Sequence, residues 1–262
     1  MTIRIGIGGW TYEPWRGTFY PEKWPHKREL EYASRRLSAI EINGTYYSSF
    51  KPASWSMWRD TVPDGFVFAV KASRYCTNRK VLAEAGESVE RFVSQGLTEL
   101  GDRLGPILWQ FMATKKFDAD DFRAFFGLLP GSHAGVPLRH AVQVRHDSFR
   151  CPEFVQMARE AGVSLVYADS AEYPAIADVT GSFVYARLEQ AVEDVPTGYD
   201  DTALGVWAAA ARAWEAGGQP GDLPYFGGET LPSIPRETFV FFINGAKVRA
   251  PQGAMALIDR LA

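Results

Sequence analysis

Short apolar runs that each end on a polar residue recur along the chain and constrain its fold more than any other feature. Lys71 follows the apolar run 66–70, and Asp169 follows the run 165–168. Near-continuous apolar runs of this length are typical of parallel strands buried on both faces. Because α/β proteins place their sites at the carboxyl ends of such strands, the pattern also predicts where this chain acts.

The strand-like runs alternate with helix-like segments. We expect eight strands, at 3–9, 39–43, 66–71, 105–110, 141–145, 164–169, 182–187 and 239–244. Helices are expected at 27–37, 52–59, 88–100, 118–128, 152–161 and 201–216, and from 251 onward. Eight βα units in about 250 residues predict an α/β fold of the (β/α)8 TIM-barrel type. A doubly wound open sheet is the alternative, but Gly6-Ile7-Gly8-Gly9 lacks the third glycine of a dinucleotide-binding motif.

Composition limits the classes of protein to consider. With 262 residues, 46% hydrophobic and 23% charged, the chain suits a single TIM-barrel domain over 1–262. A net charge of −3 gives no general attraction for nucleic acid or for an anionic membrane. Two cysteines without a Cys-x-x-Cys motif argue against a structural zinc site. The sequence shows neither a signal peptide nor an apolar stretch of membrane-spanning length, so we expect a cytoplasmic protein.

Several polar residues are expected to converge at the mouth of the barrel. Residues two apart share a face of a strand, as Glu41 and Asn43 do, and likewise Tyr167 and Asp169. If the last residue of each strand points into the mouth, one cavity is lined by Glu41, Asn43, Lys71, Gln110, Gln143, Arg145, Asp169, Arg187 and Asn244, with His146 and Lys247 just beyond. Buried charges cost several kcal/mol each unless they are paired, so folds that keep them commonly use them.

This set predicts binding of a small anionic ligand, phosphorylated metabolites included. Lys71, Arg145 and Arg187 would hold the anion, and Glu41 or Asp169 would be the general base or acid. Asn43, Gln110, His146, Asn244 and Lys247 complete the predicted substrate-binding set, and Trp10 and Tyr12 would stack on a ring or sugar.

Lys71 has two candidate roles. With a carboxylate partner its ammonium stays charged and anchors an anion, whereas without one its lowered pKa would make it a nucleophile or base. We favour the anchor, because Glu41 and Asp169 are both expected as neighbours. No cofactor is expected. Nor do we expect a metal, because three cations beside two carboxylates repel a divalent ion.

Six motifs together resemble the YecE-like family, also known as domain of unknown function 72, nearly end to end. They are Gly9-Trp10-Thr11-Tyr12, Glu41-Ile42-Asn43-Gly44-Thr45-Tyr46-Tyr47, Phe68-Ala69-Val70-Lys71, Leu108-Trp109-Gln110-Phe111, Val144-Arg145-His146 and Tyr185-Ala186-Arg187-Leu188. The resemblance implies a TIM barrel and no settled activity. Gln143, Glu189 and Ile243 depart from the family pattern, which has Glu, His and Asn there, so an activity that used those residues would be altered or lost.

Three functions follow from the residues. The first is an enzyme that acts on a small anionic metabolite, as a hydrolase, isomerase or lyase. The second is a nucleic-acid-associated protein or nuclease-like hydrolase, which the net charge disfavours. The third is a non-catalytic ligand-binding barrel. The oligomeric state is left open by the sequence.

Overall fold

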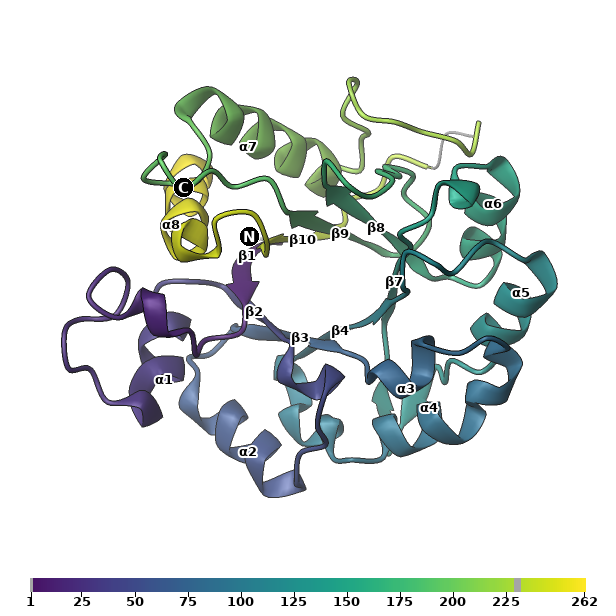
Figure 1. The fold of residues 1–262 in the computed structure, drawn as a ribbon, viewed down its shortest axis with the longest axis horizontal. Helices are drawn as coiled ribbons and strands as arrows, with labels where there is room; N and C mark the ends of the chain where they lie inside the picture. The colour runs from purple at the N-terminus through teal and green to yellow at the C-terminus, as the bar shows by residue number, and fades with distance from the viewer. Residues whose placement is uncertain (1, 229–231) are drawn as a thin grey trace.

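The computed structural model describes residues 2–228 and 232–262. Parallel strands close into a barrel in the order β1-β10-β9-β8-β7-β4-β3-β2, and helices surround it (Figure 1). The strands of this barrel are β1 (Ile3–Gly8), β2 (Ala39–Ile42), β3 (Val67–Lys71), β4 (Leu104–Gln110), β7 (His140–Gln143), β8 (Ser164–Asp169), β9 (Phe183–Leu188) and β10 (Glu237–Phe242). The predicted (β/α)8 TIM barrel is therefore confirmed.

The helices lie mostly in the connections between strands. They are α1 (Glu29–Ser34), α2 (Pro52–Thr61), α3 (Arg74–Thr77), α4 (Gly86–Val93), α5 (Ala119–Gly127), α6 (Pro152–Glu160), α7 (Asp201–Glu215) and α8 (Ala250–Leu261). Short 3-10 segments are η1 (Glu13–Trp15), η2 (His26–Arg28), η3 (Gly44–Tyr46), η4 (Leu82–Ala85), η5 (Leu97–Arg103), η6 (Asp147–Phe149) and η7 (Lys247–Arg249). None of the described helices has the length and apolar character needed to span a membrane.

One predicted helix is wrong in extent. The segment 88–100 does not form a continuous helix, because α4 ends at Val93 and Gly96 adopts a left-handed backbone with φ 108°. A side chain is strained in that conformation, so a glycine there typically ends a helix. Helix α3 and the hairpin of β5 (Ser132–His133) and β6 (Val136–Pro137) carry no strong sequence pattern and were not predicted.

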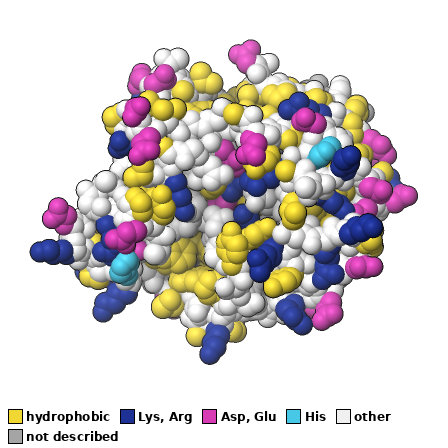
Figure 2. Space-filling view, viewed as in Figure 1, with side chains coloured by type: hydrophobic (Ala, Val, Ile, Leu, Met, Phe, Trp, Pro, Cys, Tyr) yellow, Lys and Arg dark blue, Asp and Glu magenta, His cyan; other side chains and the backbone are white. Residues whose placement is uncertain are grey.

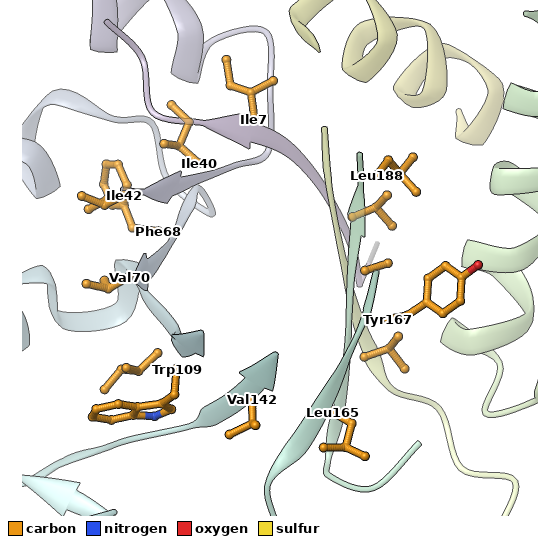
Figure 3. Packing of buried hydrophobic residues seen from close by; sticks show 14 of the residues in the cluster. Ile7, Ile40, Ile42, Phe68, Val70, Trp109, Val142, Leu165, Tyr167 and Leu188 are labelled. Carbon is orange, nitrogen blue, oxygen red and sulfur yellow. The ribbon is translucent and has the colours of Figure 1, made fainter. Parts of the chain in front are cut away.

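The core has two layers, one on each face of the barrel wall. Ile40, Val70, Trp109 and Leu165 belong to the outer layer between strands and helices (Figure 3). The inner layer fills the barrel and consists of Ala39, Val67, Ala69, Leu108, Ala141, Val166, Phe183, Tyr185, Phe239, Phe241 and Ile243. A filled interior is usual for a TIM barrel, so ligands are excluded from the barrel itself and must bind at its mouth.

Strand β1 contributes no apolar side chain to the inner layer. A Cβ at Gly6 would lie 2.1 Å from the carbonyl oxygen of Ala39 and 3.0 Å from the ring of Phe241. The strand therefore needs glycine at this position, and the Phe241 ring occupies the space beside it.

Candidate functional site

The register between neighbouring strands decides which polar residues reach the mouth. Ala168 of β8 pairs with Arg187 of β9, and Asp169 pairs with Leu188. Leu188 belongs to the outer layer, as does Tyr167, which points away from the barrel (Figure 3). Asp169 therefore faces outward, and the expectation that it lines the mouth is wrong.

Asp169 instead secures the segment that follows β9. Its carboxylate accepts hydrogen bonds from Gln190 Nε2 at 2.5 Å and from the Tyr199 hydroxyl at 2.9 Å. Burial raises the pKa of Asp169, and these two hydrogen bonds oppose the rise. These contacts tie the end of β8 to the loop that carries Glu189, so Asp169 supports the site from outside.

Beneath the mouth lies a group of mutually bonded polar residues, which we call the paired cluster: Glu41, Gln143, Tyr185, Arg187 and Glu189. Arg187 binds Glu41 through two hydrogen bonds of 3.1 Å, from Nε to Oε2 and from Nη2 to Oε1. The Tyr185 hydroxyl donates to the same Oε2 at 2.7 Å. Burial opposes charge on Glu41, but Arg187 and Lys71 outweigh it and hold the pKa of Glu41 below its ordinary value.

The other edge of Arg187 is also occupied. Its Nη1 donates to Gln143 Oε1 at 2.6 Å and to Glu189 Oε1 at 2.8 Å, and Gln110 donates to the same Gln143 oxygen at 2.7 Å. A guanidinium has five N–H donors, so these contacts and the two to Glu41 leave one Nη2–H for the mouth. Burial lowers the pKa of Arg187, but Glu41 and Glu189 raise it more, and the side chain stays charged.

Above the paired cluster is a cavity of about 440 Å³ at the carboxyl ends of the strands. It is lined by Gly8, Asn43, Tyr46, Tyr47, Lys71, Gln110, Arg145, Arg187, Ile243, Asn244 and Lys247. Figure 2 shows basic and acidic side chains gathered at the centre of this face, with hydrophobic side chains beside them. Of the predicted substrate-binding residues, Asn43, Gln110, Arg145, Arg187, Asn244 and Lys247 meet here, together with Lys71.

Three cations of the cavity, which we call the unpaired cations, lie against aromatic rings rather than carboxylates. Lys71 Nζ lies 4.5 Å from the centre of the Tyr46 ring, and Lys247 Nζ lies 4.6 Å from that of Tyr12. The guanidinium of Arg145 lies 4.2 Å from the centre of the Tyr173 ring. Over residues 2–228 and 232–262, none of the three has a carboxylate oxygen within 4.0 Å, whereas Arg187 has two such partners.

The carboxylate partner expected for Lys71 is therefore not within ion-pair distance. Burial and the nearby Arg187 lower the pKa of Lys71 to about 8, and Glu41 only partly offsets them. Burial, followed by Arg187, also lowers the pKa of Arg145, and the buried Nε of Arg145 has no hydrogen-bond partner in the described chain. The cavity thus holds positive charge that the described side chains leave uncompensated.

Trp10, Tyr12 and His146 lie around the cavity rather than in its wall. Trp10 lines a second pocket of about 280 Å³, and the ring of Tyr12 contacts the ammonium of Lys247. His146 caps η6, because its Nδ1 accepts from the backbone N–H of Ser148 at 3.1 Å. The backbone role of His146 explains its position next to Arg145 without a ligand.

Sequence reasoning missed the importance of Glu189, Tyr46 and Tyr173. Strand alternation places Tyr185 and Arg187 on one face, and the same spacing of two residues could have placed Glu189 there as well. Tyr46, the aromatic partner of Lys71, lies in η3, and Tyr173, the partner of Arg145, lies in the segment after β8, so strand alternation does not place either of them. In the described residues no group of three His, Cys, Asp or Glu side chains is placed to hold a metal ion.

Comparison with solved structures finds the same fold at low identity. A DUF72 family protein from Thermotoga maritima is 22% identical, with 99% of this chain and 98% of that chain covered and a TM-score of 0.75. One from Enterococcus faecalis is 15% identical, with 99% and 94% covered and a TM-score of 0.69. D-psicose 3-epimerase from Clostridium cellulolyticum is 13% identical, with 98% of both chains covered and a TM-score of 0.54. At these identities the likeness shows the fold alone.

No curated protein matches the chain. The family model described as protein of unknown function DUF72 matches residues 4–262. Because this match spans nearly the whole sequence, the chain belongs to the DUF72 family.

Proposed function

We propose that this protein is an enzyme that binds a small anionic metabolite in the mouth cavity and exchanges a proton with it through Lys71. The supporting observation is that Lys71, Arg145 and Lys247 line the cavity without a carboxylate in ion-pair distance in the described chain. Glu41 and Glu189 are already bound to Arg187. Over the described residues, only these two carboxylates lie within ion-pair distance of the four cations, in a chain whose net charge is −3, so the positive surplus is local and an anion complements it.

The proposed roles follow from which donors are still available. Arg145 and the remaining Nη2–H of Arg187 would donate to the anion, and Lys247, which also lines the cavity, would add a further positive charge. Asn43, Gln110 and Asn244 offer neutral polar groups for the rest of the ligand. Glu41 is fully buried and does not line the cavity, so we assign it to holding Arg187 rather than to the reaction.

Lys71 suits proton transfer because its pKa of about 8 lies near neutral pH. Acid–base groups work best when their pKa is close to the operating pH, and burial is the usual way to bring a lysine there. At pH 7 most Lys71 side chains would still be protonated and attract the anion, and a minor fraction would be neutral bases. The anchor role and the base role therefore belong to one residue in different protonation states.

The test starts from a fractionated metabolite extract incubated with the purified protein and followed by NMR. We expect wild type to deplete an anionic metabolite, and Lys71→Met to bind the same metabolite more weakly and, even at saturation, to convert it at least about a hundredfold more slowly. Arg145→Gln should instead weaken binding. Conversion by Lys71→Met at the wild-type rate, or no depletion of any anion, would contradict the proposal.

Covalent chemistry on Lys71 is distinguished in the same experiment. If Lys71 acts as a base, borohydride leaves the mass of the protein unchanged in the presence of the depleted metabolite. If the substrate carbonyl forms a Schiff base, borohydride traps it, and the adduct maps to the peptide that contains Lys71. The second result would replace the proton-transfer role with nucleophilic catalysis.

A nucleic-acid ligand is the second candidate, and one observation favours it. A groove of about 480 Å³ beside the loops after β3 and β4 is lined by Arg79, Lys80, Lys115 and Lys116. Lys115 is bound to Asp121 at 2.5 Å, so part of this charge is already neutralised. Short oligonucleotides that bind with a steep loss of affinity in salt would favour this candidate over a small metabolite.

A cytoplasmic location and the absence of a metal requirement remain predictions, the latter testable by elemental analysis.

A further inference from the structure

An apolar pocket adjoins the mouth cavity, which we call the cationic cavity here because Lys71, Arg145 and Lys247 line it. The apolar pocket has a volume of about 280 Å³ and is walled by Trp10, Phe50 and Trp58. The Trp58 ring contacts Trp10 edge-on at 5.3 Å between centroids and Phe50 at 5.0 Å. Edge-on contacts of this kind hold rings in fixed orientations, so the wall of the pocket is formed before any ligand arrives.

Three residues belong to both spaces. Gly8, Asn43 and Lys247 line the apolar pocket and also the cationic cavity, so the two volumes share a boundary. Gly9 lines the apolar pocket, and no atom lies within 4 Å of where its Cβ would be. Together the two volumes fall within the range of about 300–1,000 Å³ that is typical of small-molecule sites.

We propose that the two spaces hold one ligand, an anion that carries a flat apolar or aromatic group. The anionic part would lie against Arg145 and Lys71, the flat group against Trp10 and Trp58, and Lys247 and Asn43 would contact the link between them. This inference rests on the proposed function, because it specifies the class of anion that the cavity takes. A simple inorganic or short aliphatic anion would leave the aromatic wall in contact with water.

The test compares pairs of anions that differ only in the flat group. Methyl phosphate and phenyl phosphate are titrated calorimetrically, and acetate and phenylacetate cover the carboxylate class. We expect the aromatic member of the pair that binds to be about tenfold tighter. Equal affinity within that pair would overturn this inference while leaving the proposed function standing. If no anion of either class binds, the proposed function itself fails, and the inference fails with it.

Variants then test whether the higher affinity for the aromatic anion comes from the apolar pocket. Thr11 is exposed and lines only that pocket, so Thr11→Phe should fill it and remove the tenfold preference without changing methyl phosphate affinity. Thr18→Phe is the matched control, because Thr18 is exposed in the same loop and lines neither space. Arg145→Gln should weaken both members of the pair by the same factor. A preference that survives Thr11→Phe would show that the flat group binds elsewhere and would overturn the inference.

Discussion

Arg187 and Arg145 project into the same end of the barrel, yet their surroundings are opposite. Arg187 is 2% exposed, and four of its five N–H donors bind side chains of the paired cluster. Arg145 lies on the ring of Tyr173, and its buried Nε has no partner in the described residues. Burial of charge alone therefore does not identify a binding residue. The useful criterion is whether the protein itself supplies the counter-charge.

The same contrast separates the two kinds of energetic role. A buried ion pair that is already complete fixes the geometry of a site, and removing one member leaves an uncompensated charge. A buried cation without a partner adds little to stability and gains most from an arriving anion. We therefore expect mutations in the paired cluster to act mainly on folding, and mutations of the unpaired cations to act mainly on binding.

The largest expected effect comes from breaking the paired cluster. Glu41→Gln keeps the shape of the side chain but leaves Arg187 without its two-point partner, which should lower the free energy of unfolding by about 3–5 kcal/mol. Urea denaturation at pH 7 measures this change. A loss below about 1 kcal/mol would mean that Glu189 alone compensates Arg187.

The same substitution should change the response to acid. The pKa of Glu41 in the folded protein is lowered, so its stabilising contribution is present at neutral pH and is lost as the pH falls through that lowered pKa. Wild type should lose this contribution below the ordinary glutamate range of about 4.3, and Glu41→Gln should not. Denaturation curves at pH 7 and at successively lower pH compare the two proteins.

Substitution of an unpaired cation should have the reverse profile. Arg145→Gln should weaken sulfate binding by about 10- to 100-fold, which corresponds to the loss of a charge-assisted hydrogen bond, and should leave stability equal or higher. Calorimetry and urea denaturation on the same preparation give both numbers. Arg145→Lys is the control, because it keeps the charge but not the guanidinium fork. A large loss of stability without a loss of affinity would place Arg145 with the structural residues.

Lys71 should make sulfate binding depend on pH. Sulfate keeps its charge above neutral pH, whereas Lys71 loses its proton as the pH rises through about 8. Affinity should therefore fall by up to about tenfold between pH 8 and pH 9, and Lys71→Met should bind weakly without this step. The ligand-free protein should show the opposite trend. Its lysine pKa is below the ordinary 10.5, so the unfolded chain binds more protons and stability rises with pH across that interval.

The smallest effect is expected at an exposed ion pair. Glu87 and Arg91 face each other one turn apart on α4 at 3.3 Å, and both side chains are largely exposed. Glu87→Gln should change the free energy of unfolding by less than about 0.5 kcal/mol. It is also the matched control for Glu41→Gln, since both replace the same group. A comparable loss in the two variants would show that burial and pairing do not distinguish the paired cluster.

The sequence predicts the barrel and most of the site for a simple physical reason. Strands buried on both faces must be apolar throughout, so the polar residue that ends each run is conspicuous, as Lys71 and Gln110 are. Asp169 shows the limit of this reasoning. Which face it occupies depends on the register of β8 against β9, and that register is set by neighbouring strands rather than by the run itself.

The sequence also could not predict which charged residues of the site pair with one another. Glu41, Lys71 and Arg187 all appeared as candidates, but nothing in their spacing says that Glu41 binds the arginine and leaves the lysine to an aromatic ring. Such choices depend on distances of a few ångströms between side chains from different strands. Contacts of loop residues such as Tyr173 are harder still to predict, because loops lack the hydrophobic periodicity from which strands are predicted.

The mouth cavity takes part of its wall from the first strand and part from the loop after the last strand. Gly8 ends β1, Lys247 follows β10, and these two strands pair along the seam that closes the barrel. A ligand that touches both residues can bind only while β1 and β10 are paired. Binding therefore stabilises the paired strands against local opening. Backbone amides of β1 and β10 should then exchange their hydrogens with solvent more slowly when the site is filled.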